Sequence, residues 1–256
     1  MSASPLRVSH ERDGQLLHLQ LDRPKANIFD ARMIGALQNA LTEHLGNTGL
    51  KAVLLSARGP HFSFGASVEE HLPEQCGDML RSLHQLIRCL VGSPVPILVA
   101  VRGRCLGGAL EIAAAGHLIF AAPDAKLGQP EIRLGVFAPA ASCLLPMRIG
   151  QARAEDLLLS GRNIDAEEAH RFGLVTSIDD DPEDAALAYF DQHLEALSAS
   201  TLRLAVTAVR GDMQAAVHRR LAEVETLYLE QLMKTRDAVA GLTAFIAGEP
   251  PVWEHR

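Results

Sequence analysis

The chain has 256 residues, of which 48% are hydrophobic and 21% charged, and it carries a formal net charge of −7. This length and composition are ordinary for a globular protein with a sizeable buried core. The acidic balance argues against nucleic acid as the main partner, because phosphate binding needs a basic face.

The cysteine, histidine and apolar patterns indicate a protein without disulfide bonds, metal sites or membrane spans. The four cysteines contain no C-x-x-C pair and are expected to be reduced thiols of a cytoplasmic protein. The histidines lack metal-ligand spacing, so no metal site is expected. No secretory signal is expected at the N-terminus, and no apolar run reaches the roughly 20 residues of a membrane span.

Strands and helices are predicted to alternate through the first part of the chain. Asp30 is a plausible N-cap of the first helix, whose apolar residues follow helical spacing. The predicted elements are a strand over 15–22, a helix over 30–46, a strand over 51–57, a helix over 77–91, a strand over 97–103, a helix over 107–116 and a strand over 117–122. This order predicts an α/β fold with crossover connections.

The character of the sequence changes after about residue 138. Two short helices are predicted over 154–162 and 165–173, the second opened by a capping-box pattern, and a last strand over 174–178. From Pro182 onward the pattern is helical. An apolar stripe runs through Val217, Leu221, Val224, either Leu227 or Tyr228, and Leu232. We therefore divide the chain into an α/β part over 1–181 and a helical part over 182–256.

Glu111 stands in "CLGGALEIAAAG", a run that is otherwise small or apolar. An unpaired carboxylate buried in such a run is costly. Either Glu111 is a solvent-facing acid near a helix N-terminus, or it serves chemistry. Gly107 and Gly108 precede it and would let backbone N–H groups approach a ligand closely.

Glu131 follows in "LGQPEIRLG", 20 residues beyond Glu111, with one predicted strand between them. Taken alone, it is a surface acid in a loop or a short extended piece. If the two carboxylates meet in one cavity, they can hold a water molecule between them, and repulsion and burial would keep one of them protonated. One base and one acid at a single water are what adding or removing water requires.

Two further segments offer groups for binding. Gly65-Ala66 in "FSFGAS" and Gly108 could supply two backbone N–H donors from separate segments, which together would form an oxyanion hole, although the loop could also be a simple turn. In "RPKANI", Arg23 and Lys25 could bind an anion such as a phosphate, or could be solvated loop cations.

These segments, in this order, resemble the enoyl-CoA hydratase/isomerase (crotonase) family over nearly the whole chain. The resemblance implies a spiral of β-β-α turns with a helical C-terminal trimerisation region, a homotrimer or dimer of trimers, an acyl-CoA thioester substrate and no further cofactor. It also implies that Glu111 and Glu131 are catalytic and that Ala66 and Gly108 form the oxyanion hole. The implied CoA and substrate contacts are Arg23, Lys25, Ala26, Ile28, Gly65, Ser67, Val68, Gly107 and Phe137.

The sequence departs from the common family pattern in three places. Ser67 stands where an aspartate is usual, "FAPAAS" over 137–142 stands where a glycine-rich acyl-pocket segment is usual, and the C-terminal "FIAGEPP" lacks the usual basic residues. Within the family, "KANIFD", "FSFGASVEEHL" and "RLGVFAPAAS" resemble hydratases of anaerobic benzoyl-CoA breakdown, whose substrate is a cyclic dienoyl-CoA.

The predicted function is therefore that of a hydro-lyase that adds water to an α,β-unsaturated acyl-CoA thioester. In this hypothesis Glu111 activates the water and Glu131 supplies or removes the proton on substrate carbon. Alternatives are a general enoyl-CoA hydratase, a double-bond isomerase or another reaction of the family. An alternative of a different class is a non-catalytic scaffold or RNA-binding relative.

Overall fold

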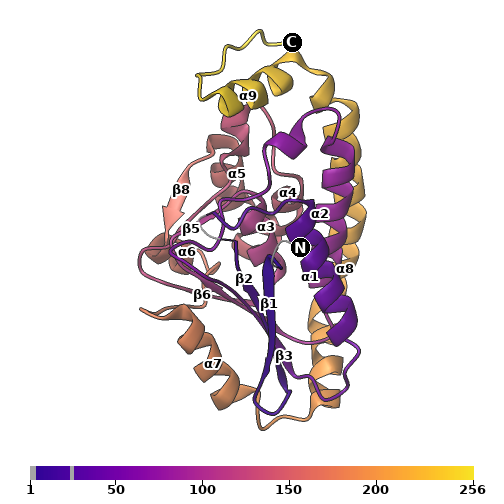
Figure 1. The fold of residues 1–256 in the computed structure, drawn as a ribbon, viewed down its shortest axis with the longest axis vertical. Coiled ribbons are helices and arrows are strands. Elements are labelled where there is room, and N and C mark those ends of the chain that lie inside the picture. Colours follow the sequence, from indigo (N-terminus) through magenta and orange to yellow (C-terminus); the bar gives the residue numbers. More distant parts are fainter. Residues whose placement is uncertain (1–3, 24–25) are drawn as a thin grey trace.

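Two β-sheets organise the protein, which a computed structural model describes over residues 4–23 and 26–256 (Figure 1). The larger sheet has the strand order β1-β2-β3-β4-β6-β9, and the smaller one has the order β5-β7-β8. The β1/β2 and β7/β8 pairs are antiparallel, and the other pairs are parallel. The strands are β1 Leu6–Glu11, β2 Leu16–Leu21, β3 Ala52–Ala57, β4 Ile97–Val101, β5 Arg104–Leu106, β6 Leu118–Ala121, β7 Lys126–Gly128, β8 Asn163–Asp165 and β9 Ser177–Ile178.

The helices connect these strands and then continue alone beyond β9. They are α1 Ala31–His44, α2 Cys76–Val91, α3 Gly108–Ala115, α4 Pro139–Ile149, α5 Gln151–Ser160, α6 Ala166–Arg171, α7 Pro182–His193, α8 Ala199–Glu230 and α9 Arg236–Ala247. Three 3-10 turns are η1 Glu69–His71, η2 Pro130–Leu134 and η3 Leu232–Lys234. The order β1-β2-α1 and β4-β5-α3 shows the expected β-β-α turns.

Local sequence signals account for several boundaries. The Asp30 side chain accepts a hydrogen bond from Met33 N at 2.9 Å, which confirms it as the N-cap of α1. The Asp165 side chain accepts from Glu168 N at 2.8 Å and caps α6 in the same way. β3 and β4 are almost continuously apolar because parallel strands in this sheet are covered on both faces.

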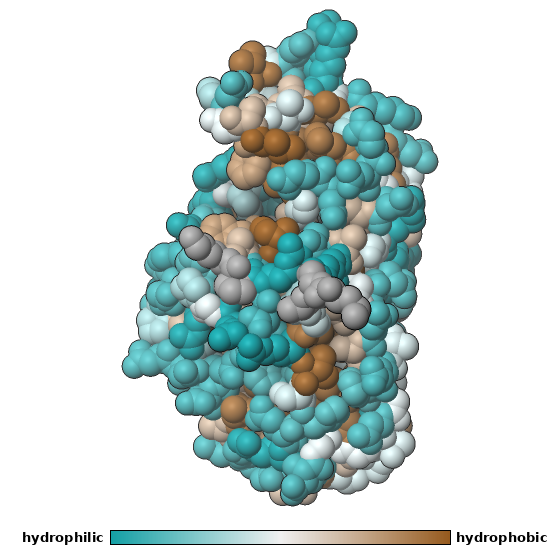
Figure 2. All heavy atoms as spheres, viewed as in Figure 1, coloured by the Kyte–Doolittle hydropathy of each residue, from teal (hydrophilic) through white to brown (hydrophobic). Residues whose placement is uncertain are grey.

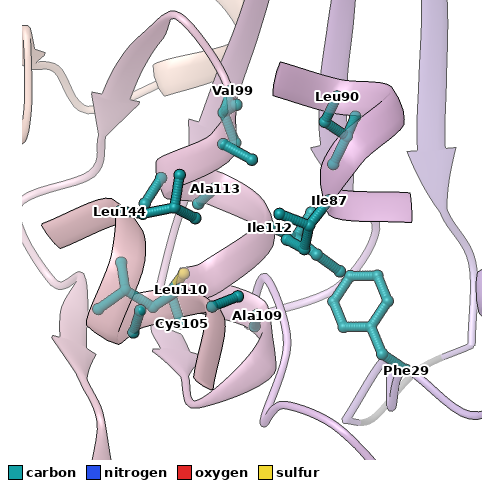
Figure 3. Packing of buried hydrophobic residues seen from close by; sticks show 14 of the residues in the cluster. Phe29, Ile87, Leu90, Val99, Cys105, Ala109, Leu110, Ile112, Ala113 and Leu144 are labelled. Carbon is teal, nitrogen blue, oxygen red and sulfur yellow. The ribbon is translucent and has the colours of Figure 1, made fainter. Parts of the chain in front are cut away.

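The two faces of the large sheet bury separate apolar clusters. The main cluster lies under α1, α2, α3 and α4, and α3 is surrounded by apolar side chains such as Ile87 and Leu144 (Figure 3). A second cluster joins Leu98 and Phe120 of the sheet to Phe190 of α7. The α3 helix therefore lies in the apolar interior, and all its residues are buried.

The long helix α8 runs along one side of the molecule, and α9 covers one end, near the C-terminus (Figure 1). The predicted apolar stripe is confirmed on α8, where Val217, Leu221 and Val224 are buried. Of the two alternatives for its next position, Tyr228 is fully buried, whereas Leu227 is 43% exposed. The last position of the stripe is not on this helix, because α8 ends at Glu230 and Leu232 lies half-buried in η3. Because Tyr228 and not Leu227 packs into the core, its hydroxyl group is buried in the interior.

Some elements were not predicted from the sequence. Glu131 lies in the 3-10 turn η2, not in a loop or an extended piece, because Pro130 at its first position favours a turn of helix. The α4 helix and the strands β1, β5, β7 and β8 were also missed. The strands β5, β7 and β8 have three residues each, too few to show a period. The strand β1 has six residues but only Leu6 is buried, so it lacks an alternating pattern, and α4 contains Pro146, which is unusual inside a helix. Among the described residues, no helix is long and apolar enough to cross a membrane.

Candidate active site

The N-terminus of α3 forms at a sharp turn after β5. Gly107 has φ 55°, a left-handed conformation that favours glycine, and it ends the strand and begins the helix. Its N–H donates to the carbonyl of Gly128, 2.9 Å away, which ties the turn to β7. This turn places Glu111 in the first turn of α3.

Glu111 is buried, with only 2% of its surface exposed. Its Oε1 accepts a hydrogen bond from Ala141 N at 2.8 Å, in the first turn of α4. The first turn of a helix has free N–H groups and a positive dipole end, so it suits a carboxylate. The interpretation of Glu111 as a solvent-facing surface acid is therefore wrong.

Glu131 reaches the same turn from η2. A methyl group built on Gly107 would lie 2.5 Å from Glu131 Oε1, so the carboxylate packs directly on the Gly107 backbone. The buried side chain of Gln129, with its amide oriented to donate, lies 3.1 and 3.2 Å from the two Glu131 carboxylate oxygens. This contact explains how the carboxylate is oriented.

The two carboxylates share one electrostatic environment. Burial raises the pKa of Glu111 above the usual carboxyl range, although the N–H groups of Ala140 and Ala141 oppose the shift. Burial also raises the pKa of Glu131, and the nearby Glu111 charge raises it further. Like charges in a dry site do not both ionise readily, so near neutral pH the pair favours one carboxylate and one carboxylic acid.

Two unpaired backbone donors lie beside the pair. A methyl group on Gly108 would lie 3.2 Å from Ala66 N, and one on Gly65 would lie 3.4 Å from Gly108 N. Within residues 4–23 and 26–256, neither Ala66 N nor Gly108 N donates a hydrogen bond. Two adjacent free N–H groups from different segments are the geometry of an oxyanion hole.

The segment after β2 runs beside this loop. Phe64 N donates to Ala26 O at 3.0 Å, and Phe29 N donates to Gly65 O at 2.9 Å. These bonds bring the predicted contact residues Ala26 and Ile28 close to Gly65. Ile28 is half-buried and lies in the sequence between Ala26 and Phe29, which form these two bonds.

The remaining predicted contacts are placed less favourably for a phosphate. The Arg23 guanidinium is paired with Asp30, the N-cap of α1, so it is not a free cation in this structure. Lys25 lies outside the described residues. The Ser67 hydroxyl donates to Glu69 Oε2 at 2.9 Å and accepts from Glu70 N at 3.3 Å, so it holds the η1 turn.

Val68 and Phe137, the last two predicted contacts, are half-buried and pack against the main cluster. Phe137 opens the "FAPAAS" segment that leads into α4, and its ring lies 5.2 Å from the Tyr228 ring. The same segment supplies Ala141, the anchor of Glu111. A predicted substrate contact, Phe137, and the anchor of the predicted catalytic residue Glu111 thus lie on one stretch of chain.

The arrangement can perform one kind of chemistry well. It joins an acid, a base and two N–H donors within a dry region, which suits proton transfer next to a carbonyl group that gains negative charge. Over the described parts of the chain, no three His, Cys, Asp or Glu side chains cluster as metal ligands would.

Sequence reasoning missed Gln129 and Ala141. Gln129 stands two residues before Glu131 in "LGQPEIRLG", but a glutamine in a loop carries no signal of its own. Ala141 acts through its backbone, which no side-chain pattern can reveal.

Comparison with known proteins defines the class. The profile of the enoyl-CoA hydratase/isomerase family matches residues 11–256, and the chain belongs to this family. The fold agrees: a solved enoyl-CoA hydratase from Bacillus halodurans superposes with a TM-score of 0.87 at 22% identity, covering 94% of this chain and 100% of that one. The expected crotonase-like α/β fold is thereby confirmed.

Sequence relatives narrow the comparison. The chain is 63% identical over 255 residues to cyclohexa-1,5-dienecarbonyl-CoA hydratase of Thauera aromatica, covering 100% of this chain and 99% of that protein. It is 32% identical over 251 residues to a probable enoyl-CoA hydratase of Mycobacterium bovis, covering 96% and 97%. The first similarity is about twice as high as the second and spans both the α/β part and the helical part.

Proposed function

We propose that this protein is a hydro-lyase that adds water to cyclohexa-1,5-diene-1-carbonyl-CoA and forms 6-hydroxycyclohex-1-ene-1-carbonyl-CoA, a step of anaerobic benzoyl-CoA degradation. The observation that carries the reaction type is the neighbouring pair Glu111 and Glu131, in which the charge of one raises the pKa of the other, beside the free N–H groups of Ala66 and Gly108. The similarity to the Thauera aromatica hydratase supports the cyclic substrate.

The first step follows from the geometry. In this proposal the thioester carbonyl accepts hydrogen bonds from Ala66 N and Gly108 N, which stabilise the negative charge that develops on its oxygen. The ionised Glu111 takes a proton from water, and the water oxygen bonds to ring carbon 2, which is conjugated with the carbonyl. The electron pair of the carbon 1–carbon 2 double bond moves to the thioester oxygen.

In the second step the dienolate is protonated and the two glutamates return to their starting protonation states. The dienolate extends over the carbon 5–carbon 6 double bond, so a proton from Glu131 on carbon 5 leaves a new double bond between carbons 1 and 6. Renumbering the ring gives the 6-hydroxy-1-ene product, in which the double bond stays conjugated with the thioester. Protonation of carbon 1 would instead separate the double bond from the carbonyl. Afterwards Glu111 carries the proton taken from water, and its return to Glu131 resets the pair.

The proposed reaction uses no cofactor apart from the CoA of the substrate, because the residues supply the acid, the base and the anion-binding groups. Arg23, Lys25, Ala26, Ile28, Ser67 and Val68 stay proposed contacts of the CoA part. A free phosphate-binding guanidinium would require Arg23 to leave Asp30 when CoA binds.

The test is the fate of the oxygen of labelled water. Incubation of the cyclic dienoyl-CoA with the enzyme in H₂¹⁸O should place one label in the ring product and leave the thioester intact. Crotonyl-CoA serves as the comparison substrate and should turn over more slowly. Release of free CoA would indicate a hydrolase, and a shifted double bond without label would indicate an isomerase. Either result would overturn the proposed function.

We further propose that the chain assembles as a homotrimer or a dimer of trimers. Large apolar side chains are exposed in the helical part, including Leu204 and Val209 of α8 at 72% and 82% and Phe245 of α9 at 53%. Figure 2 shows apolar side chains gathered at the end of the molecule that carries α9. Light scattering should give three or six times the chain mass of 27.6 kDa, and a monomer would contradict the proposal.

We also propose that the protein is cytoplasmic and that neither nucleic acid nor a membrane is among its partners. The four cysteines are all free thiols, which supports a reducing compartment. The net charge of −7 supports a small anionic substrate held by local groups over a polyanionic partner.

A further inference from the structure

Tyr228 of α8 is a fully buried tyrosine near the candidate active site. Its ring lies 5.2 Å from the ring of Phe137 at an interplanar angle of 67°, an edge-to-face pair. Phe137 begins the segment over 137–142, which carries Ala141, the hydrogen-bond donor to Glu111. Tyr228 thus packs on the segment that we assign to the acyl side of the site.

The hydroxyl of Tyr228 has no hydrogen-bond partner among the described residues. A buried tyrosine hydroxyl is normally paired, because leaving it unpaired is unfavourable. Its electrostatic neighbours are the Cys76 thiol and the carboxyls of Glu131 and Glu111, and together with burial these raise the pKa of the hydroxyl well above its usual value. The group therefore keeps its proton and can donate a hydrogen bond within the site.

Packing alone does not explain this side chain. The other buried positions of the same helix stripe, Val217, Leu221 and Val224, are aliphatic, and a leucine or phenylalanine would fill the same space without an unpaired donor. His84 of α2 also has an unpaired buried nitrogen, but its Nδ1 is bound to Glu225. Among the described residues the Tyr228 hydroxyl stands out because it is wholly unpaired and its ring packs on Phe137, in the segment whose Ala141 N–H binds Glu111.

We propose that Tyr228 determines acyl specificity: in the complex a flat acyl ring packs against the aromatic wall formed by the rings of Tyr228 and Phe137, and the Tyr228 hydroxyl donates to the oxygen that the hydrated ring carries. Because Tyr228 is fully buried in this structure, the acyl ring reaches it by displacing the side chains that cover it. The proposal rests on the proposed function. The aromatic wall distinguishes a flat ring from a linear chain. The hydroxyl distinguishes a hydrated acyl group, which carries an acceptor oxygen on its β-carbon, from an acyl group that lacks this oxygen and leaves the hydroxyl unpaired.

The experiment compares two ligands that differ by one hydroxyl group. They are 6-hydroxycyclohex-1-ene-1-carbonyl-CoA and cyclohex-1-ene-1-carbonyl-CoA, titrated calorimetrically into Glu131→Gln protein, whose slow turnover preserves the alcohol. Adding Tyr228→Phe to this background should weaken the alcohol about tenfold or more and the hydrocarbon ring less than twofold. Tyr189→Phe, which alters the other tyrosine of the chain, should change neither.

Two further readouts separate specificity from structure. Tyr228→Phe alone should leave the thermal midpoint of the unliganded protein unchanged or higher, because only an unpaired hydroxyl is removed. Tyr228→Ala should improve kcat/KM for a six-carbon linear enoyl-CoA relative to the cyclic substrate, because the aromatic wall is lost. Equal weakening of both ring ligands, or weakening of neither, by Tyr228→Phe would overturn the proposal.

These outcomes are distinguishable from failure of the proposed function. Turnover of the cyclic dienoyl-CoA by the unmodified protein tests that function directly. The ligand pair tests Tyr228 by binding alone, so a protein that binds the ring alcohol selectively yet does not hydrate the diene would support one proposal and contradict the other.

Discussion

The Glu131 carboxyl shows how a residue that is unfavourable for folding can suit the proposed chemistry. Its pKa is raised in the folded protein, so the folded state binds more protons than the unfolded state above the usual carboxyl pKa of about 4.3. The stability of the protein should therefore fall as pH rises from that value through the raised pKa. The same shift supplies a carboxylic acid near neutral pH.

Replacing Glu131 by glutamine should separate these two effects. Loss of the acid should lower kcat by about 10²–10⁴-fold with a smaller change in acyl-CoA affinity. The free energy of unfolding at pH 8 should rise, and its decline with pH should become shallower. Urea unfolding at several pH values and steady-state kinetics measure both. Glu167→Gln, which changes an exposed glutamate, is the control, and near-normal turnover of Glu131→Gln would contradict the mechanism.

The coupled pair also predicts a pH profile. Activity requires one carboxylate and one carboxylic acid, so kcat should rise as the base ionises and fall as the acid ionises. Because both pKa values are raised, both limbs should lie above the usual carboxyl range. The profile of kcat against pH measures this, and a single limb near pH 4 would show that the two groups do not act together.

Gly107 gives a backbone test of the same site. A methyl group there meets Glu131 Oε1 at 2.5 Å and the residue has φ 55°, so Gly107→Ala should displace the carboxylate. A displacement of about 1 Å can cost roughly 100-fold in rate. Gly211→Ala in α8 has no atom within 4 Å of its new methyl group and should stabilise the helix by about 0.5–1 kcal/mol. Equal activity of the two variants would contradict the assigned contact.

At the scale of elements, α3 is held at both ends by other parts of the chain. Its N-terminal turn lies against the Gly65-Ala66 loop, and its C-terminal carbonyls are bound by two arginines. Arg210 of α8 donates to Ala115 O at 3.1 Å and to Gly116 O, and Arg148 of α4 donates to Gly116 O at 3.3 Å. Positive charge at a helix C-terminus is stabilising, so α8 helps to position the helix that carries Glu111.

Arg210→Met should therefore destabilise the protein. The substitution leaves Ala115 O without its donor and Gly116 O with Arg148 alone, and a buried hydrogen bond to a charged group is worth about 1.5–3 kcal/mol. Arg219→Met, an exposed change on the same helix, should stay within about 0.5 kcal/mol of the unmodified protein. Denaturant unfolding compares them. A loss no larger than that of the control would show that α3 does not depend on this contact.

At the scale of the whole molecule, the helical part completes both apolar clusters. Val217, Leu221 and Tyr228 belong to the main cluster, and Phe190 of α7 belongs to the cluster on the other face of the sheet. The division into residues 1–181 and 182–256 is visible in the pattern of elements and stays a prediction. The core itself runs across the boundary.

Truncating the chain tests whether residues 1–181 can fold without the helical part. A chain ending at residue 181 loses α7, α8 and α9, and it exposes both faces of the sheet where they packed. We expect it to be insoluble or to lack a cooperative unfolding transition, because the remaining part cannot bury its apolar surface. Circular dichroism during heating measures the transition. A cooperative transition in this fragment would show that residues 1–181 fold independently.

Much of the molecule was predictable from the sequence by itself. The α/β alternation, the caps at Asp30 and Asp165, and the apolar stripe of α8 follow from short-range rules of periodicity and hydrogen bonding. Glu111 was also recognisable, because an acid among small apolar residues is costly. Glu131 taken alone was interpreted as a surface loop acid, and only its possible pairing with Glu111 and the family resemblance singled it out. The three-residue strands and η2 were not recognisable, since so few residues carry no period.

Only the tertiary structure decided which groups meet. The 19 residues between Glu111 and Glu131 pass through β6 and β7 before η2 brings the second carboxyl onto Gly107, and Ala66 arrives from a separate loop. The orienting contacts of Gln129 and Ala141, the pairing of Arg23 with Asp30, and the choice of Tyr228 over Leu227 likewise depend on which segments pack together. Local sequence determines the shape of each element, whereas burial against distant elements determines which polar groups face one another and what their pKa values become.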